Sequence, residues 1–370
     1  MLGDVWRFLV FLFDWKSWIR RLSGKNEIDV VFITNLRDDL DRKRSKGIFS
    51  SSVGHFDGVR YWISGTSGRM RIIDVDSEEL TTEEGKRKAK DHFISAVFWA
   101  RKKGAKVVLL AAGTKRLFGK DGAELKYRFP DVLFTNGDNG TAFILQEDVK
   151  VALERSNLRP GSSKICIIGP YGILGESILK FLLKSGYDVV GVGRNEEALS
   201  GIKERYGIEL CRENSHVGKV DAVIACTHSK DVCLTAEDVD ILRKERKKLV
   251  VVDVAEPSNF NYKEYDKCKN VVVRQDAGNA YSHKLEYVLG PLSYKALRLN
   301  KGVTFGCFSE SLAVAHALRS GNDSVKDVDW FSVSEDNMEL VKDLFSEIYF
   351  KAPEPRCFGK HIDSFELSLK

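Results

Sequence analysis

The chain has 370 residues, of which 43% are hydrophobic and 30% charged, and its formal net charge is +5. This length exceeds one typical domain, and the balance of apolar and charged residues excludes an intrinsically disordered chain. Basic and acidic residues are interleaved along the sequence, which argues against a nucleic-acid-binding protein. The seven cysteines are scattered without a C-x-x-C pair, so we expect no metal site, no redox motif, and a reducing cytoplasmic compartment.

The amino-terminal segment, residues 1–26, is unusually aromatic. Its longest uncharged run, Phe8 to Phe13, is far shorter than the roughly 20 apolar residues that span a bilayer, and no small-residue cleavage site follows it. The pattern predicts an amphipathic helix over residues 1–22 that either contacts a membrane surface or docks on protein, and the residues alone leave both open. The polar residues that recur at helical spacing and leave a broad aromatic face are Asp4, Arg7, Asp14, Ser17 and Arg21.

Residues 27–157 alternate between strand-like and helix-like patterns, which predicts an amino-terminal α/β domain. We assign this domain to substrate binding. A polar turn at residues 134–142 opens its last helix, which runs towards Leu153. The other segments are predicted strands at 28–34 and 106–112, a hairpin around 59–63 within the Gly- and Ser-rich stretch 47–68, and a helix at 91–103.

A glycine motif follows the linker at residues 158–163. The apolar run Lys164 to Ile168 leads into Gly169, Gly172 and Gly175, spaced G-x-x-G-x-x-G, and a helical pattern and a second apolar run follow. A strand, a Gly-rich turn and a helix hold a dinucleotide pyrophosphate, because the glycines admit the phosphates and the helix N-terminus offers free N–H groups. The residues expected to contact the cofactor here are Gly169, Tyr171, Gly172, Ile173, Leu174 and Gly175.

The end of the second strand predicts which dinucleotide is bound. An NAD site normally has Asp or Glu at this position, whereas an Arg accommodates the 2′-phosphate of NADP. This chain has Arg194 followed by Asn195, with no acid before Glu196. The pattern therefore predicts NADPH as the cofactor.

Further strands are predicted at residues 222–226, 249–254 and 270–274, with helical stretches between them. This alternation predicts a Rossmann-type domain with a doubly wound parallel sheet over residues 158–300. Ligands of such sheets bind at the carboxyl ends of the strands. We therefore expect the cofactor to meet the loops at Thr227–His228–Ser229 and Ala255–Glu256–Pro257, with Thr227 as a contact.

Residues 301–370 are predicted to form a helical carboxyl-terminal part. Cys307 follows a glycine at the expected beginning of an apolar helix. A helix N-terminus stabilises a thiolate and lowers its pKa, so Cys307 is a candidate nucleophile. A buried cysteine of purely structural role is the alternative that the local pattern leaves open.

Taken in chain order, these segments resemble the long-chain fatty acyl-(acyl-carrier-protein) reductases of cyanobacteria, from about residue 28 to about residue 318. The glycine motif and the cysteine segment are the distinctive parts, and their order along one chain makes the similarity more than a shared fold. The matching segments are 134–137 with 141–142, 169–175, 194–195, 251–253 with Pro257, Gly278 with His283, and 307–310.

The resemblance implies an NADPH-dependent reduction of a fatty acyl thioester to a fatty aldehyde. The acylated cysteine of the family falls on Cys307, and the acyl donor would be acyl carrier protein or acyl-CoA. The developing oxyanion would be bound by Thr135, Gly137 or Thr141 and by the first N–H groups of the helix after Cys307. His283 would either give a proton to the departing thiol or have a structural role.

The chain departs from that family in its aromatic amino terminus, in Pro170–Tyr171 after the first glycine, and beyond about residue 320. Acyl chain length, the choice between carrier protein and CoA, and the oligomeric state therefore stay open. The alternatives are an NAD(P)-dependent dehydrogenase of a small polar substrate and a non-catalytic nucleotide-binding protein. A reductase resembling glutamyl-tRNA reductase would need a basic RNA-binding region, which the sequence lacks.

Overall fold

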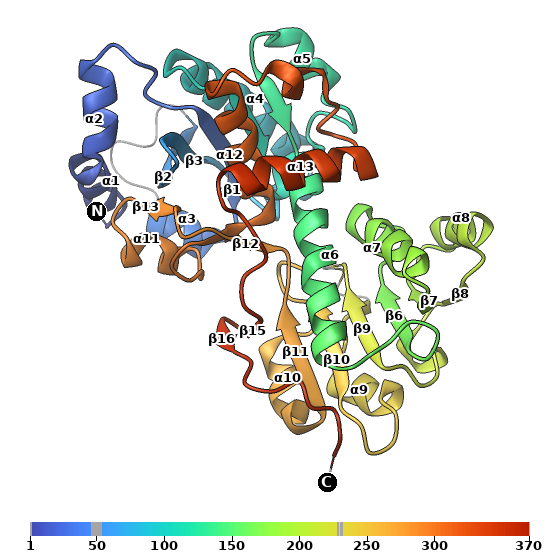
Figure 1. The fold of residues 1–370 in the computed structure, drawn as a ribbon. Helices are drawn as coiled ribbons and strands as arrows, with labels where there is room; N and C mark the ends of the chain where they lie inside the picture. The colour runs from blue at the N-terminus through green and yellow to red at the C-terminus, as the bar shows by residue number, and fades with distance from the viewer. Residues whose placement is uncertain (1, 46–53, 228, 230–231, 370) are drawn as a thin grey trace. The chain divides into compact units, whose positions relative to one another are not determined.

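The computed structural model describes residues 2–45, 54–227, 229 and 232–369 (Figure 1). The chain divides into two compact units. Unit 1 comprises Met1–Gly140 and Ala280–Lys351, and unit 2 comprises Thr141–Asn279 and Ala352–Lys370. Both are α/β structures, which confirms the predicted fold class.

Unit 1 is built on a mixed six-stranded sheet with the order β13-β2-β3-β1-β4-β5. The strands β3, β1, β4 and β5 run parallel, whereas β2 forms antiparallel pairs with β3 and with β13. The bounds are β1 Val30–Leu36, β2 His55–Ile63, β3 Thr66–Asp76, β4 Val107–Leu110, β5 Leu133–Thr135 and β13 Glu286–Tyr287. A separate two-stranded sheet pairs β12 (Asn279–Tyr281) with β14 (Val303–Phe305).

Among the helices of unit 1, α4 and α12 pack against this sheet, whereas α13 packs against α12. The long helix α4 begins at Glu83 because the Thr82 side chain accepts a hydrogen bond from the Gly85 amide at 3.0 Å. The α-helices are α1 Leu2–Phe13, α2 Trp15–Leu22, α3 Asp39–Ser45, α4 Glu83–Lys102, α5 Ala123–Arg128, α11 Pro291–Ala296, α12 Gly306–Arg319 and α13 Glu335–Glu347. Short 3-10 turns are η1 Glu79–Thr81, η2 Ala112–Arg116 and η6 Asp323–Asp327.

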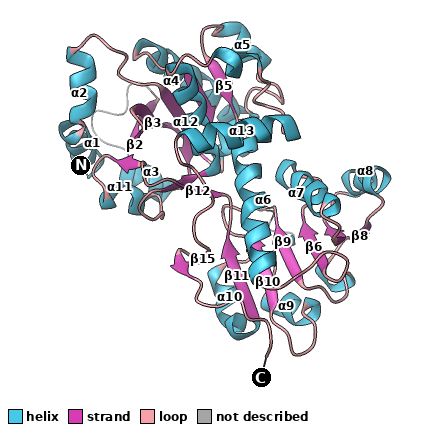
Figure 2. Ribbon diagram, viewed as in Figure 1, coloured by secondary structure: helices cyan, strands magenta, loops and turns pink. Residues whose placement is uncertain are grey.

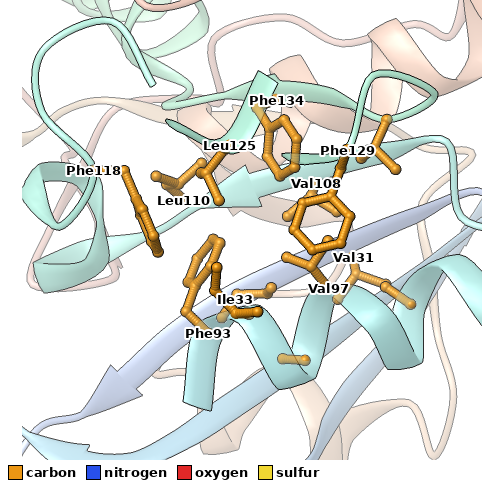
Figure 3. Close-up of a cluster of buried hydrophobic side chains, with 14 of the residues drawn as sticks. Val31, Ile33, Phe93, Val97, Val108, Leu110, Phe118, Leu125, Phe129 and Phe134 are labelled. Carbon is orange, nitrogen blue, oxygen red and sulfur yellow. The ribbon is translucent and has the colours of Figure 1, made fainter. Parts of the chain in front are cut away.

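One core of unit 1 lies between α4 and the sheet (Figure 3). Phe93 and Val97 on α4 belong to the same buried cluster as Ile33 of β1 and Val108 of β4. The rings of Phe93 and Phe118 are 5.0 Å apart, between their centroids. Burial of these apolar side chains is the main force that holds α4 on the sheet.

Unit 2 has a parallel six-stranded sheet with the order β11-β10-β9-β6-β7-β8, whose strands lie side by side in Figure 2. Numbered from the first strand of the unit, this is the 3-2-1-4-5-6 order of dinucleotide-binding folds. The strands are β6 Lys164–Ile168, β7 Asp188–Val192, β8 Glu209–Cys211, β9 Ala222–Ala225, β10 Leu249–Asp253 and β11 Val272–Asp276, with β15 Arg356–Cys357 and β16 Lys360–His361 as a small hairpin. The helices and 3-10 turns are α7 Ile173–Lys184, α8 Glu196–Tyr206, α9 Ala236–Leu242, α10 Tyr262–Cys268, η3 Asn214–His216 and η5 Lys269–Val271, and α6 (Asp138–Arg155) connects the two units.

The boundaries of the two units differ from the predicted domains 27–157, 158–300 and 301–370. The chain returns to unit 1 at residue 280, where β13 pairs with β2 and α12 packs against β3 and β4. The carboxyl terminus returns to unit 2, where Ser368 forms an isolated bridge with Lys247. Local patterns show which residues form strands, but the partner of each strand is set by long-range pairing.

Most predicted elements are present, with shifted ends. The apolar runs predicted as strands coincide with β1, β4, β6, β7, β9, β10 and β11, and the hairpin around residues 59–63 is β2 with β3. Two segments were read too narrowly: Phe134 and Thr135 form β5 instead of a turn, and α4 includes residues 83–90. Residues 46–53, where loops were predicted, and His228 lie outside the described part of the chain.

The amino-terminal segment forms two helices, α1 and α2, separated at Asp14, where one continuous helix was expected. Asp14 is buried and caps α2, and its carboxylate accepts hydrogen bonds from Arg60 at 2.7 Å and from Trp62 at 3.0 Å. Val10 packs against Trp62 and Val288. The segment therefore docks on unit 1 through Asp14 and its neighbours. Within the described ranges, no helix combines the length and apolar character needed to cross a membrane.

We predict that Asp14→Ala destabilises the protein by about 3 kcal/mol, because the buried Arg60 guanidinium loses its carboxylate partner at 2.7 Å and keeps only Asp57, at 3.6 Å. Urea unfolding followed by circular dichroism measures the loss. Asp4→Ala is the matched control, since the Asp4–Arg7 pair is more exposed and its removal costs under about 1 kcal/mol. Equal stability of the two variants would contradict the role assigned to Asp14.

Candidate active site

Cys307 is the second residue of α12, which confirms its predicted place at the beginning of a helix. Its side chain is partly buried and lies against Gly137, the residue that ends the turn after β5. Gly137 has a φ of +72°, and a Cβ at this position would lie 2.2 Å from the Cβ of Cys307. Only a glycine fits here, so the turn after β5 and the start of α12 are in direct contact.

Glu310 lies one turn further along α12 and is fully buried. One carboxylate oxygen accepts a hydrogen bond from the Thr135 hydroxyl, and the other accepts one from the Gly140 amide at 2.6 Å. The Thr135 hydroxyl oxygen in turn accepts the Gly137 amide at 2.9 Å. Glu310 thus fastens the turn at residues 135–140 to the helix that carries Cys307.

Glu310 was not predicted as a site residue, although an acid three residues after Cys307 in an apolar helix is a usable signal. Thr135 and Gly137 were predicted to bind the oxyanion. Both are beside Cys307, but the Thr135 hydroxyl and the Gly137 amide already donate to Glu310 and Thr135 respectively. Their observed contacts make them positioning residues of the site.

A third charged side chain completes the cluster. Lys115, in η2, forms an ion pair with Asp138 at the beginning of α6. Burial lowers the pKa of Lys115, whereas the nearby acidic groups raise it. The net shift of this pKa is upward, and the acidic groups are Asp138, Cys307 and Glu310. Lys115 is therefore a protonated cation close to Cys307, and no local sequence pattern predicts its place there.

The environment of Cys307 does not favour its thiolate. Burial raises the pKa of the Cys307 thiol to about 11; Lys115 opposes this rise, whereas Asp138 and Glu310 add to it. The expectation that the helix N-terminus lowers this pKa is wrong, because burial outweighs the helix dipole. Burial also raises the pKa of the Glu310 carboxyl to about 7, despite hydrogen bonds from Thr135 and Gly140 that lower it.

Thr141 and His283 were also predicted as site residues. Thr141, on α6 in unit 2, has its methyl group 3.4 Å from the position that a Cβ on Gly278 would occupy. His283 is exposed, and the centroid of its ring is 5.0 Å from that of Tyr349. Among the contacts recorded for the described residues, none joins His283 to Cys307, so its proposed proton transfer has no structural support.

The raised pKa of Glu310 predicts a pH-dependent stability. The folded protein retains a proton that the unfolded chain releases near pH 4.5, the ordinary value for this group, so the stabilisation is complete below that pH and is lost as the pH rises through about 7. Relative to Glu310→Gln, the wild type should lose up to about 3 kcal/mol of unfolding free energy between about pH 5 and 8. Urea unfolding at several pH values measures this difference. Exposed Glu204→Gln is the control, and parallel pH profiles for all three proteins would contradict the prediction.

The glycine motif in unit 2 forms a close backbone turn between β6 and α7. A Cβ on Gly175 would lie 2.0 Å from the Gly169 carbonyl oxygen, and Gly169 has a φ of +84°. Gly172 is the N-cap of α7 and provides no side-chain cap, and the following Ile173 is 52% exposed. The first turn of α7 therefore presents backbone N–H groups that no N-cap side chain occupies, which fits a pyrophosphate.

Thr227 follows β9. The strands β9 and β6 are neighbours, and the order of the strands in the sheet reverses between them. A Cβ on Gly169 would lie 2.9 Å from the Thr227 Cβ, so the two residues are in contact across this switch point. Asn259 donates to the Thr227 carbonyl at 2.9 Å and accepts the Leu234 amide at 3.0 Å. Asn259, which the sequence did not indicate, holds this loop at the place where such sheets bind ligands.

The end of β7 carries the residues predicted to select the cofactor. Tyr171 packs on Gly193, where a Cβ would lie 2.4 Å from the tyrosine ring. Asn195 caps α8 by accepting the Ala198 amide at 3.0 Å, so its side chain serves the helix. Arg194 is exposed, and it has no ion-pair partner within the described ranges. A free guanidinium at this strand end fits a 2′-phosphate.

Residues 164–257 match the family model described as NADP oxidoreductase, coenzyme F420-dependent. The match covers less than half of the chain and spans the glycine motif, β7 and the loop after β10. Among curated protein sequences, none matches this chain significantly.

Solved structures with weak similarity include CAD from Helicobacter pylori in complex with NADP(H), with 16% identity and a TM-score of 0.28 over 37% of this chain and 38% of that one. L-tryptophan dehydrogenase from Nostoc punctiforme shows 12% identity and a TM-score of 0.39 over 85% and 90% of the two chains. The nucleotide-binding domain of glutamyl-tRNA reductase from Thermoplasma volcanium shows 21% identity and a TM-score of 0.27 over 35% and 84%.

This chain spans little more than a third of the Helicobacter pylori protein, and at these TM-scores none of the three likenesses bears on the reaction. The strand order, the glycine turn and the family match together identify residues 164–257 as an NADP-binding Rossmann-type region of an oxidoreductase.

Proposed function

We propose that the protein is an NADPH-dependent reductase that converts a fatty acyl thioester to a fatty aldehyde through an acyl-Cys307 intermediate. The observation that carries this proposal is the cluster of Cys307, Glu310 and Lys115 in unit 1. It combines a nucleophile at a helix start, a buried carboxyl with a pKa of about 7, and a partly buried cation. These are the groups that acyl transfer to a cysteine requires. The acyl donor is a carrier-protein or CoA thioester.

Acyl transfer begins with the Cys307 thiol. Because burial raises the pKa of this thiol to about 11, the sulfur needs a base as it attacks the thioester carbonyl. We assign that role to Glu310, whose carboxylate takes the thiol proton while the new carbon–sulfur bond forms. The bond to the departing carrier sulfur then breaks, and Glu310 returns the proton to that sulfur. Atoms and charge balance, and the acyl group remains on Cys307.

Negative charge develops on the carbonyl oxygen in both halves of the reaction. The N-cap of α12, Phe305, provides no side-chain cap, so the first N–H groups of this helix are available donors beside Cys307. We assign the compensating positive charge to Lys115. Thr135 acts through Glu310, whose carboxylate it holds in place by a hydrogen bond.

The residues of unit 2 that would hold the cofactor are the turn at 169–175, Thr227 and Arg194. When bound, NADPH supplies the hydride that reduces the acyl carbon. The bond between that carbon and the Cys307 sulfur then breaks, the sulfur leaves with the bonding electrons, and the oxygen forms the aldehyde carbonyl. Glu310, which takes up a proton from water after the carrier thiol has left, gives that proton to the Cys307 sulfur and restores the thiol.

We expect a stable acyl adduct on Cys307 when the protein meets a long-chain acyl-CoA or acyl-carrier thioester without NADPH, because the second half of the reaction is then blocked. Intact-mass spectrometry and peptide mapping measure the adduct. Cys307→Ala should lose both the adduct and aldehyde formation, whereas Cys211→Ser, a partly buried cysteine in unit 2, should retain both. Aldehyde formation by Cys307→Ala would overturn the covalent mechanism, and no aldehyde from the wild type would favour a dehydrogenase of a small polar substrate.

We predict a preference for NADPH over NADH that depends on Arg194. The charge-assisted contact with a 2′-phosphate is worth roughly 1.5–3 kcal/mol, so Arg194→Ala should lower the ratio of NADPH to NADH affinity about tenfold or more. Titration followed by nicotinamide fluorescence measures both affinities. Arg212→Ala is the control, because Arg212 is also exposed but pairs with Glu196. An unchanged ratio in Arg194→Ala would remove Arg194 from the cofactor site.

A further inference from the structure

The amino-terminal helices α1 and α2, beside β2 in Figure 1, expose an apolar face. Phe8 is 62% exposed, Trp15 60% and Leu22 85%. Phe8 lies on α1, whereas Trp15 and Leu22 lie on α2, so both helices carry exposed apolar side chains. The further exposed apolar side chains of the two helices are Val5, Phe11, Leu12, Phe13, Trp18 and Ile19. We call this set, with Phe8, Trp15 and Leu22, the aromatic face.

The polar residues of the segment explain why the aromatic face points outward. Asp14 and Ser17 are buried, and their side chains hydrogen-bond to each other and to Arg60 and Arg69 of the sheet. Near the end of α2, Arg20 forms an ion pair with Asp29 at 2.8 Å, which also holds this helix in place. The helices therefore cannot turn the aromatic face inward without breaking buried charge pairs, which is costly.

The charge around the aromatic face is basic. Residues 1–25 contain five basic and two acidic side chains, and both acids are neutralised, Asp4 by Arg7 and Asp14 by Arg60. Arg21 and Lys25 are exposed, and neither has an ion-pair partner in the described part of the chain. Aromatic side chains flanked by unpaired basic ones suit the interface between the headgroups and the acyl chains of an anionic membrane.

A groove of about 870 Å³ lies next to α2 in unit 1. Trp15, Lys25, Trp62, Lys284 and Arg319 line it, together with the pairs Lys16–Glu286 and Arg20–Asp29. The two acidic side chains of the groove, Asp29 and Glu286, are therefore in ion pairs. Lys25 and Lys284 add exposed positive charge to it. Aromatic and cationic groups in one groove fit a phospholipid headgroup phosphate beside the aromatic face.

We propose that α1 and α2 form a membrane-surface anchor, with the aromatic face in the interfacial layer of an anionic bilayer and Arg21 and Lys25 on the lipid phosphates. A second copy of the chain is a poorer occupant. A two-fold contact through the aromatic face would bring the unpaired basic residues of both copies together. The inference does not depend on the reaction at Cys307.

The test uses the full chain and vesicles of phosphatidylcholine and phosphatidylglycerol at a molar ratio of about three to one. In the quadruple variant Phe8→Gln, Leu12→Gln, Ile19→Gln and Leu22→Gln, all four changes are at exposed side chains, so folding should be retained. We expect wild type to float with the vesicles, and the variant to need at least about tenfold more lipid. The control variant, Tyr127→Gln with Tyr262→Gln, changes exposed aromatic residues elsewhere and should bind as wild type does.

A second arm separates the charges from the apolar contact. Arg21→Gln with Lys25→Gln should weaken binding to the anionic vesicles several-fold, and added salt should reduce the difference. Unchanged flotation of the quadruple variant, or no flotation of the wild type, would overturn the proposal. So would a wild-type dimer in solution that the quadruple variant abolishes, because the aromatic face would then be covered by a second copy.

Discussion

The carboxylate of Glu310 is the group on which the candidate active site depends. It joins two segments that are more than 160 residues apart in sequence, the turn after β5 and the first turns of α12, through hydrogen bonds with Thr135 and Gly140. A buried carboxyl with two donors is stable only if the donors stay in place, so the turn and the helix constrain each other. Gly137 completes this constraint, because any side chain there would collide with Cys307.

The same burial decides the chemistry available to the site. An isolated cysteine at a helix N-terminus would have a lowered pKa, but here removal from water raises the pKa of Cys307 and also that of Glu310. The two groups therefore suit proton transfer during attack better than a preformed thiolate. Lys115 stabilises the anionic forms of Cys307 and Glu310, because its positive charge lowers the pKa of both groups.

The amino-terminal segment shows how a buried charge orients an amphipathic element. Burial of Asp14 against Arg60 holds the polar side of α1 and α2 on the sheet, and it leaves the aromatic side in water. The sequence alone suggested membrane contact or docking as alternatives for one apolar face. In the structure the segment docks through Asp14, Ser17 and the buried Val10, so the exposed aromatic face remains available for a second partner.

The sequence by itself determined the dinucleotide-binding region, because its glycine turn, strand runs and Arg194 are local features. Close backbone approach needs glycine at residues 169 and 175, and alternation of short apolar runs with helices predicts parallel strands. It also placed Cys307 at a helix start. Only the tertiary structure brought Glu310, Lys115 and Gly137 to that cysteine, returned β13 and α12 to unit 1, and turned Asp14 inward. Those outcomes depend on long-range pairing and on burial, which no local spacing of residues encodes.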